Sequence, residues 1–459
     1  MNSQSKKMEL LGSTSIPKAL LAMGIPTMIG MLVNAFYNLV DAYFVGGLGE
    51  SQMGAISVVY PLGQVVVGLG LLFGNGAASY ISRLLGRGDK ENADKVASTA
   101  LYSSVSVGAV IILISMVFLH PILKLLGATD SILPYAATYA GIYIVSCIFN
   151  VFNVTMNNIV TSEGAAKTTM CALLTGAVLN IALDPLFIYV FDLGVAGAAI
   201  ATAISQVVST CVYLTYIFRK KSVFRFRVKD CTYTKETMSE IFKIGIPTLV
   251  FQILTSVSIS LINNAAGDYG DSAIAGMGVV TRLISMGSLS VFGFIKGFQP
   301  IAGYSYGAKK FDRLREAIKT SILWSTVFCV IFGVILALFP TAIVSQFTKG
   351  DAEMIRIGAA SLRANGISIM LFGFYTVYSS LFLALGKGRE GFILGACRQG
   401  ICFIPVILLL PMVWGLNGIM YAQPIADVLS AVITVFMAIP LHKKLNEMQR
   451  KTAEISPNN

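Results

Sequence analysis

The chain has 459 residues, of which 55% are hydrophobic and only 12% are charged, and its mean hydropathy is +0.74. Such a composition cannot cover a soluble globular surface with polar side chains, which excludes the soluble classes and indicates an integral membrane protein. The formal net charge of +11 is typical of membrane proteins with basic inner loops, so we expect no nucleic-acid partner.

Apolar stretches recur along the whole chain with lengths close to the ~20 residues that cross a bilayer as a helix. They are centred near residues 31, 67, 106, 146, 179, 207, 254, 288, 327, 370, 401 and 427. We therefore predict an all-α integral membrane protein with twelve transmembrane helices.

The second half of the chain repeats the first. The motif GIPTMIG that begins at Gly24 returns as GIPTLVF at Gly245, and GVAG at 194–197 returns as GLNG at 415–418, with the same offset of 221 residues. The repeat predicts two pseudo-symmetric six-helix lobes. The predicted segments are a cytoplasmic N-terminal segment (1–16), an N-lobe (17–218), a cytoplasmic linker (219–240), a C-lobe (241–441) and a charged, disordered cytoplasmic tail (442–459).

Basic residues are concentrated in alternate loops. If both termini are cytoplasmic, the inner segments contain 27 of the 34 Lys and Arg residues, and the outer loops contain Lys124, Lys349 and Arg356. This bias predicts a multi-pass protein with both termini in the cytoplasm. The basic linker is able to contact anionic lipid headgroups, and a solvated connector that fixes the topology is the alternative.

Three carboxylates fall within apolar stretches, where a charge is costly and by default indicates a functional site. Asp41 lies in the first helix and Asp184 in the fifth, roughly 7 and 12 Å below the outer ends at 1.5 Å per residue. The repeat aligns these acids with Ile262 and Pro405. Only the N-lobe therefore has this pair, whereas Asp427 belongs to the C-lobe.

The surroundings of Asp184 suit a small cation. Asn180 precedes it by four residues and shares its helix face, Pro185 frees the carbonyl of Ile181, and Thr202 on the sixth helix offers a hydroxyl. Oxygen ligands of this kind suit a hard cation such as Na⁺, and two neighbouring carboxylates are also able to share one proton. The alternative is that Asp184 only hydrogen-bonds Asn180 and nearby backbone to fix helix packing.

Two further polar stripes are candidates for substrate binding. On the first helix, Asn34 and Asn38 share the face of Asp41. The fourth helix has a longer stripe at spacings of three and four, made of Tyr139, Tyr143, Ser146, Asn150, Asn153 and Asn157. Such a face could line an aromatic cavity for a flat cation, and the alternative is polar contacts between helices.

The C-lobe contains a candidate ion pair. Arg398 and Asp427 lie on neighbouring helices at similar depth, roughly 12 Å from the inner boundary. We predict that they pair, in a structural role. Lys296 is expected to extend from the end of the eighth helix to the membrane surface.

Several of these segments resemble the multidrug and toxic compound extrusion (MATE) family, in its bacterial DinF-like branch. The resemblance extends from about residue 15 to 441 and rests on YNLVDAYFVGGLG (37–49), SRLLGRGD (82–89), LNIALDPLFIY (179–189), GVAGAAIAT (194–202) and GIPT (245–248). It implies a central cleft between the lobes, and it matches the branch's first-helix acid, fifth-helix Asn and Asp and sixth-helix Thr to Asp41, Asn180, Asp184 and Thr202. Other branches place a cation-binding acid in the second lobe, but here Ile262 faces Asp41.

The resemblance implies a secondary transporter in the bacterial plasma membrane that exports drug-like cations in exchange for H⁺ or Na⁺ by alternating access. We expect a monomer, no cofactor besides the coupling ion, and no enzyme activity, because the sequence has no metal, nucleophile or phosphate-loop motif. The alternative is a flippase or exporter of a lipid-linked or anionic substrate that uses Arg282, Arg363 and Arg398. The sequence does not decide between H⁺ and Na⁺, and it does not name the substrate.

Overall fold

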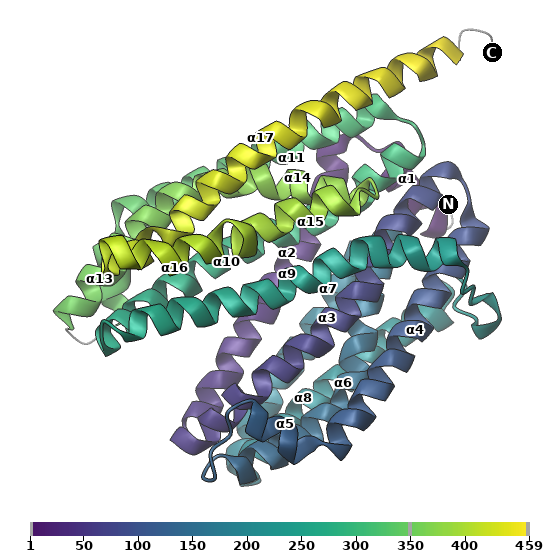
Figure 1. The fold of residues 1–459 in the computed structure, drawn as a ribbon. Helices are drawn as coiled ribbons and strands as arrows, with labels where there is room; N and C mark the ends of the chain where they lie inside the picture. The colour runs from purple at the N-terminus through teal and green to yellow at the C-terminus, as the bar shows by residue number, and fades with distance from the viewer. Residues whose placement is uncertain (1–2, 348–350, 456–459) are drawn as a thin grey trace.

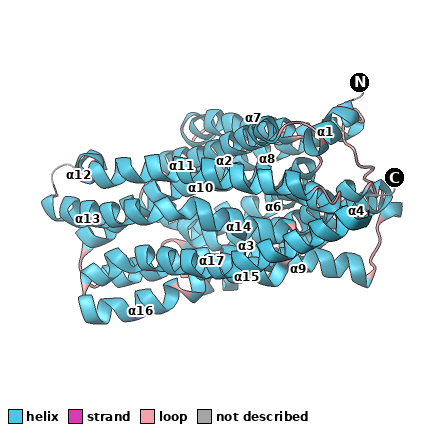
Figure 2. Cartoon of the chain, turned by 90° about the horizontal axis from the view of Figure 1, so that it is seen from above, coloured by secondary structure: helices cyan, strands magenta, loops and turns pink. Residues whose placement is uncertain are grey.

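The computed structural model describes residues 3–347 and 351–455, and every regular element in these two ranges is helical (Figure 2). Twelve helical segments in this part of the chain are long and apolar enough to cross a membrane. Figure 1 shows them as two bundles that converge at the end of the molecule carrying both termini and diverge toward the other end. We call these the terminal end and the far end.

The N-lobe consists of the first six long segments. They are α2 (Ile16–Gly46), α3 (Glu50–Arg87), α4 (Lys90–Val117), α6 (Leu133–Ser162), α7 (Ala166–Pro185) with the π-helical turn η1 (Leu186–Val190), and α8 (Gly194–Phe218). The short helices α1 (Ser3–Gly12) and α5 (Leu119–Leu125) precede α2 and follow α4.

The C-lobe repeats this order, with two of its long segments interrupted. Its segments are α9 (Lys235–Gly267), α10 (Asp271–Gly307), α11 (Phe311–Leu338), α13 (Ala352–Ser368) with η4 (Ile369–Leu371) and α14 (Phe372–Ala384), α15 (Gly388–Ala396) with η5 (Cys397–Ile401) and α16 (Phe403–Trp414), and α17 (Leu416–Ile455). The short elements are η2 (Val228–Asp230), α12 (Pro340–Val344) and η3 (Ser345–Phe347).

The helix bounds agree with the repeat read from the sequence. Helices α4 and α11 begin and end 221 residues apart, and α2 and α9 end with the same offset. Both lobes also have a π-helical turn in their fifth segment, η1 in the N-lobe and η5 in the C-lobe. Such turns re-aim side chains and occur often at functional sites.

The lobes meet at the terminal end through glycines that allow backbones to approach closely. A methyl group on Gly245 of α9 would overlap the carbonyl of Leu72 on α3, and one on Gly297 of α10 would overlap the backbone of Gly24 on α2. Small residues at helix crossings permit this packing in membrane proteins. An ion pair between Arg83 of α3 and Glu240 of α9, at 2.7 Å, adds to this contact.

We expect Gly245→Ala to destabilise the protein by about 1–3 kcal/mol, because the added methyl group has only rigid backbone to displace. Thermal unfolding in detergent measures the effect. Gly141→Ala is the matched control, since Gly141 has open space around it and alanine favours a helix by up to about 1 kcal/mol. Equal unfolding temperatures for the two variants would contradict a close crossing at Gly245.

Helix α1 bridges the two lobes at the terminal end. Lys7 forms an ion pair with the fully buried Glu163 at the end of α6, with 3.1 Å between Nζ and Oε1. From the C-lobe, Lys310 donates to the carbonyl of Gly12 at 2.7 Å and Arg313 donates to that of Leu11 at 3.2 Å. The predicted N-terminal segment is therefore a packed helix.

The predicted disorder after residue 441 is wrong for the residues that the structure describes. Helix α17 continues to Ile455, and Leu441 and Leu445 are buried against the C-lobe. His442 Nε2 lies 2.8 Å from the hydroxyl of Tyr378 on α14, and this contact holds α17 against the C-lobe as well. Apolar residues at helical spacing within the charged segment explain the difference. Likewise, α9 begins at Lys235, six residues before the predicted start of the C-lobe.

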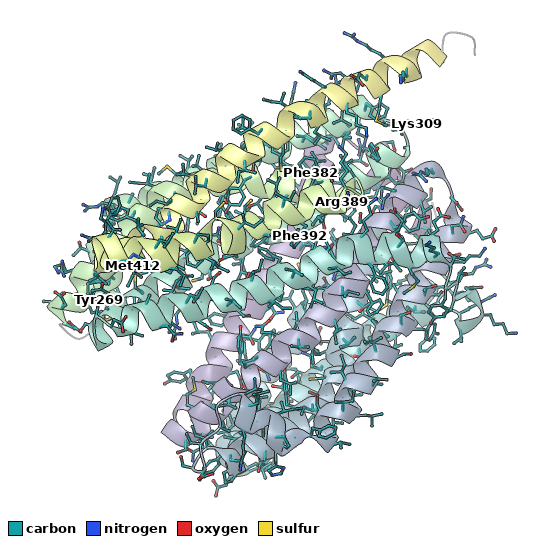
Figure 3. The ribbon with its side chains drawn as sticks, in the orientation of Figure 1. Tyr269, Lys309, Phe382, Arg389, Phe392 and Met412 are labelled. Atoms are coloured by element: carbon teal, nitrogen blue, oxygen red, sulfur yellow. The ribbon has the colours of Figure 1, made fainter. Side chains whose placement is uncertain are left out.

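Figure 3 shows where charged and apolar side chains lie along the C-lobe. Lys309 lies at the terminal end, and Tyr269 and Met412 lie at the far end. The linker and residues 442–455 also lie at the terminal end (Figure 1). The basic residues that predict an inner face are therefore gathered on one end of the molecule.

Candidate functional site

The four predicted coupling residues come together in the N-lobe. Asn180 on α7 donates through Nδ2 to Asp184 Oδ1 and to Thr202 Oγ1 on α8, each at 3.4 Å. The carboxyl groups of Asp41 on α2 and of Asp184 are close enough to interact electrostatically. Asp184 is fully buried, and Asp41 is partly buried. We call Asp41, Asn180, Asp184 and Thr202 the acidic cluster.

Three oxygen atoms of the acidic cluster are buried without a hydrogen-bond donor among the described residues. They are Asp41 Oδ1, Asn180 Oδ1 and Asp184 Oδ2. Buried acceptors normally have partners, so a group of unpartnered acceptors is a candidate site for a proton or a cation. The donor set is all oxygen, which fits H⁺ or Na⁺.

Local structure positions these side chains. Asp184 is followed by Pro185, where α7 ends and the turn η1 begins. Proline supplies no N–H to the helix, so the chain changes its winding directly beside the carboxylate. Asn180 and Asp184 stay on one face because four residues make about one helical turn.

Tyrosines surround the acidic cluster. Tyr139 and Tyr143 on α6 stack with ring centroids 5.6 Å apart and planes at 14°, and Tyr139 interacts electrostatically with Asp41. Tyr37 on α2 interacts with both carboxylates. Tyr37 was not among the predicted site residues, although its position four residues before Asp41 places it on the same helix face.

The amides that the sequence suggested for substrate binding have partners within the protein. Asn38 donates to the carbonyl and side-chain oxygens of Asn34 at 2.8 and 3.0 Å. Asn153 contacts Gln206 and Thr210 on α8. Asn153 therefore joins α6 to α8, which agrees with the alternative interpretation of polar contacts between helices.

A central cavity of about 510 Å³ lies between the lobes, mostly against C-lobe helices. None of the six candidate substrate residues, Asn34, Asn38, Tyr139, Tyr143, Asn153 and Asn157, is among its lining residues, and neither are Asp41 and Asp184. The cavity volume is in the range of drug-sized ligand sites. The acidic cluster and the central cavity are therefore separate sites.

Arg398 and Asp427 form the predicted pair. The distance between Arg398 Nε and Asp427 Oδ1 is 3.0 Å, and both side chains are buried. Ser368 and Gln423 also donate to the Asp427 carboxylate, at 3.0 and 2.9 Å. The Arg398 guanidinium lies over the ring of Phe372, 4.6 Å from its centroid.

The basic residues of the flippase alternative do not gather in the central cavity. Arg282 and Arg363 are exposed and are not among its lining residues. Arg398 lines the cavity, but Asp427 compensates its charge. These three residues therefore form no cationic cluster for a pyrophosphate group.

Lys296 differs from its sequence-based interpretation. Its helix, α10, continues for eleven residues to Gly307, so Lys296 does not lie at the end of the helix. Lys296 lines the cavity and hydrogen-bonds to Asn157 Oδ1 on α6. The expectation that it extends along the helix end to a membrane surface is wrong, because the side chain points into the cavity and toward α6.

Comparisons with known proteins agree with this architecture. The MatE family profile matches residues 26–186 and 247–409, one range in each lobe. The multidrug export protein MepA of Staphylococcus aureus (strain MSSA476) is 32% identical over 429 residues, covering 93% of this chain and 94% of that protein. MepA of Staphylococcus saprophyticus is 32% identical over 433 residues, covering 94% and 95%.

Solved structures extend the likeness to three dimensions. An outward-facing multidrug resistance MATE family transporter of the MOP superfamily has a TM-score of 0.90 and 26% identity, covering 97% of this chain and 99% of that chain. A MOP superfamily transporter from Pyrococcus furiosus, described as having a binding pocket of reverse polarity, has a TM-score of 0.89, the same identity and the same coverage. The chain therefore belongs to the MATE family of multidrug efflux transporters, which are multi-pass membrane proteins and not enzymes.

Proposed function

We propose that this protein exports amphipathic drug-like molecules, including cations, across a bacterial plasma membrane in exchange for H⁺ or Na⁺, and that the acidic cluster couples ion entry to export. The observation that carries the proposal is the group of three unpartnered oxygens in the acidic cluster, where Asp41 and the buried Asp184 interact electrostatically. Two ionised carboxylates at this separation repel each other, and one proton or Na⁺ between them removes the repulsion.

Exchange requires that ion and substrate favour different states of the protein. Asp41 and Asp184 lie on different helices, so the ion that bridges them changes how α2 packs against α7. Pro26 gives α2 a point at which it is able to bend, since proline removes one helical hydrogen bond. With the termini in the cytoplasm, the glycine crossings close the inner side, and the central cavity faces outward.

The experiment that tests this proposal is efflux of a fluorescent cation from reconstituted vesicles, with the pH gradient and the Na⁺ gradient imposed separately. We expect at least one of the two gradients, applied alone, to drive export against the dye gradient, and collapse of that gradient by an ionophore to stop it. Equal dye movement with and without either gradient would contradict ion-coupled export.

A further inference from the structure

The central cavity has an uneven charge distribution. Its described lining includes two basic side chains, Lys296 and Arg398, and no aspartate or glutamate. The other lining residues are apolar, aromatic, amide or hydroxyl side chains. A ligand in the cavity therefore meets positive charge or no charge.

The two basic residues are not equivalent. Arg398 is neutralised by Asp427 at 3.0 Å. Lys296 has a neutral partner, Asn157, and no ion pair links it to an acid among the described residues. Lys296 is partly buried, and a positive charge withdrawn from water is costly unless a counter-charge accompanies it. The uncompensated positive charge in the cavity thus belongs to Lys296.

The sequence repeat supports a specific role for this charge. Lys296 occupies the position that Asn75 holds in the N-lobe, 221 residues earlier, and both residues line the cavity. Asn75 donates to the Thr248 hydroxyl at 2.9 Å, so this neutral side chain has a hydrogen-bond partner within the protein. The fold therefore accommodates a neutral amide at this position in the N-lobe, and only the C-lobe has a charged side chain there.

Aromatic surface lies next to Lys296. One face of α10 lines the cavity from Thr281 to Gln299, and Phe292 lies one turn before Lys296 on that face. Phe292 packs edge-on against Phe251 of α9, with ring centroids 5.9 Å apart. Lys296 also lines a small pocket between α3, α6 and α10, where the lobes approach each other. An aromatic ring against the phenylalanines would therefore direct an acidic substituent toward the lysine.

We propose that the central cavity binds aromatic amphipathic compounds bearing a carboxylate, such as zwitterions, and that Lys296 determines this specificity by pairing with the carboxylate. The inference rests on the proposed export function and names its substrate class. Because Asp41 and Asp184 do not line the cavity, the coupling cation and an anionic group of the substrate occupy different sites without competing.

The test compares two dyes that share one aromatic system. Rhodamine B has a free carboxylate and is a zwitterion, whereas its ethyl ester is a cation. Fluorescence anisotropy with the purified full-length protein gives the dissociation constant of each dye. We expect the wild type to bind rhodamine B roughly tenfold more tightly than the ester, the effect of one charge-assisted hydrogen bond in a partly desolvated site.

Variants at two positions isolate the charge. Lys296→Gln is expected to abolish the preference, and Lys296→Arg to retain it. Asn157→Asp leaves the lysine in place but gives it an acidic partner, so we expect the preference to be lost there too. Arg282→Gln removes a positive charge from the same helix outside the cavity and is the control that should keep the wild-type ratio. Thermal unfolding verifies that each variant is folded.

An unchanged ratio of dissociation constants in Lys296→Gln would overturn the proposal, and so would a wild type that prefers the ester or binds neither dye. Vesicle transport of the same dyes separates this inference from the proposed function. If the wild type binds rhodamine B through Lys296 but no ion gradient drives its export, the binding site stands and the export function fails. If an ion gradient drives export of both dyes but Lys296→Gln changes neither binding nor transport, the export function stands and the role of Lys296 fails.

Discussion

Replacing Asp184 by asparagine is expected to abolish ion-driven export while leaving the protein folded in the membrane. Asparagine keeps the size of the side chain and the contact with Asn180, but it removes the charge that a proton or Na⁺ neutralises. Because only Asp41 is then ionisable, the acidic cluster no longer alternates between a repelling pair of carboxylates and a pair neutralised by a cation. The measurement is dye efflux from vesicles under the gradient that drives the wild type, and we expect at least a tenfold loss of the initial rate, since the coupled step is removed.

The matched control for this variant is Asp192→Asn. Asp192 follows the same helical segment, is exposed, and has a φ of 53°, a conformation that asparagine adopts readily. Its replacement should leave efflux at the wild-type rate. Retained gradient-driven efflux in Asp184→Asn, at an equal amount of protein in the vesicles, would remove Asp184 from the coupling mechanism.

The second large effect is expected in the C-lobe, on stability. Replacing Asp427 by asparagine leaves the buried Arg398 without a counter-charge, which costs about 3–5 kcal/mol when one partner of a buried ion pair is removed. The asparagine oxygen is still able to accept from Gln423 in place of Oδ1, and its NH2 group in place of Oδ2 is able to donate to the Ser368 hydroxyl, so the loss reports mainly on the charge. The unfolding temperature in detergent measures it.

The double variant Arg398→Gln with Asp427→Asn distinguishes a pair from two independent residues. If the two side chains act as a pair, the double variant is more stable than the sum of the two single losses predicts, because it contains no uncompensated charge. Additive losses would show that Arg398 and Asp427 stabilise the lobe separately. Lys309→Gln, at the terminal end, is a control for removing a positive charge that is not buried, and it should change stability by less than about 0.5 kcal/mol.

Most of the fold follows from local sequence patterns. Hydropathy and the 221-residue repeat predict twelve segments in two lobes, because a helix in lipid must satisfy its own backbone hydrogen bonds whatever its neighbours are. The interruptions at η4 and η5 were not predicted, since the apolar stretches that contain them are continuous. The helical continuation of α17 was also missed, because packing against the C-lobe outweighs the charged composition of that segment.

The acidic cluster was accessible from the sequence for a simple reason. A carboxylate in an apolar helix has to face a polar partner or a cavity inside the bundle, and the spacing of Asn180 and Asp184 places both on one helix face. The same reasoning paired Arg398 with Asp427 from their depths. It did not include Tyr37, which lies beside both carboxylates. The assignment to the DinF-like branch stays a prediction of the resemblance, and the sequence does not choose between H⁺ and Na⁺.

The sequence by itself therefore determined the number of helices, the duplication and the lobe that contains the paired acids, because these depend on hydropathy, spacing and the identity of aligned residues. The tertiary structure alone decided which side chains line the central cavity. Lys296 faces the cavity because the rotation of α10 is set by the glycine crossings with α2. The direction of a side chain within a bundle depends on contacts with helices distant in the sequence, which no local pattern contains.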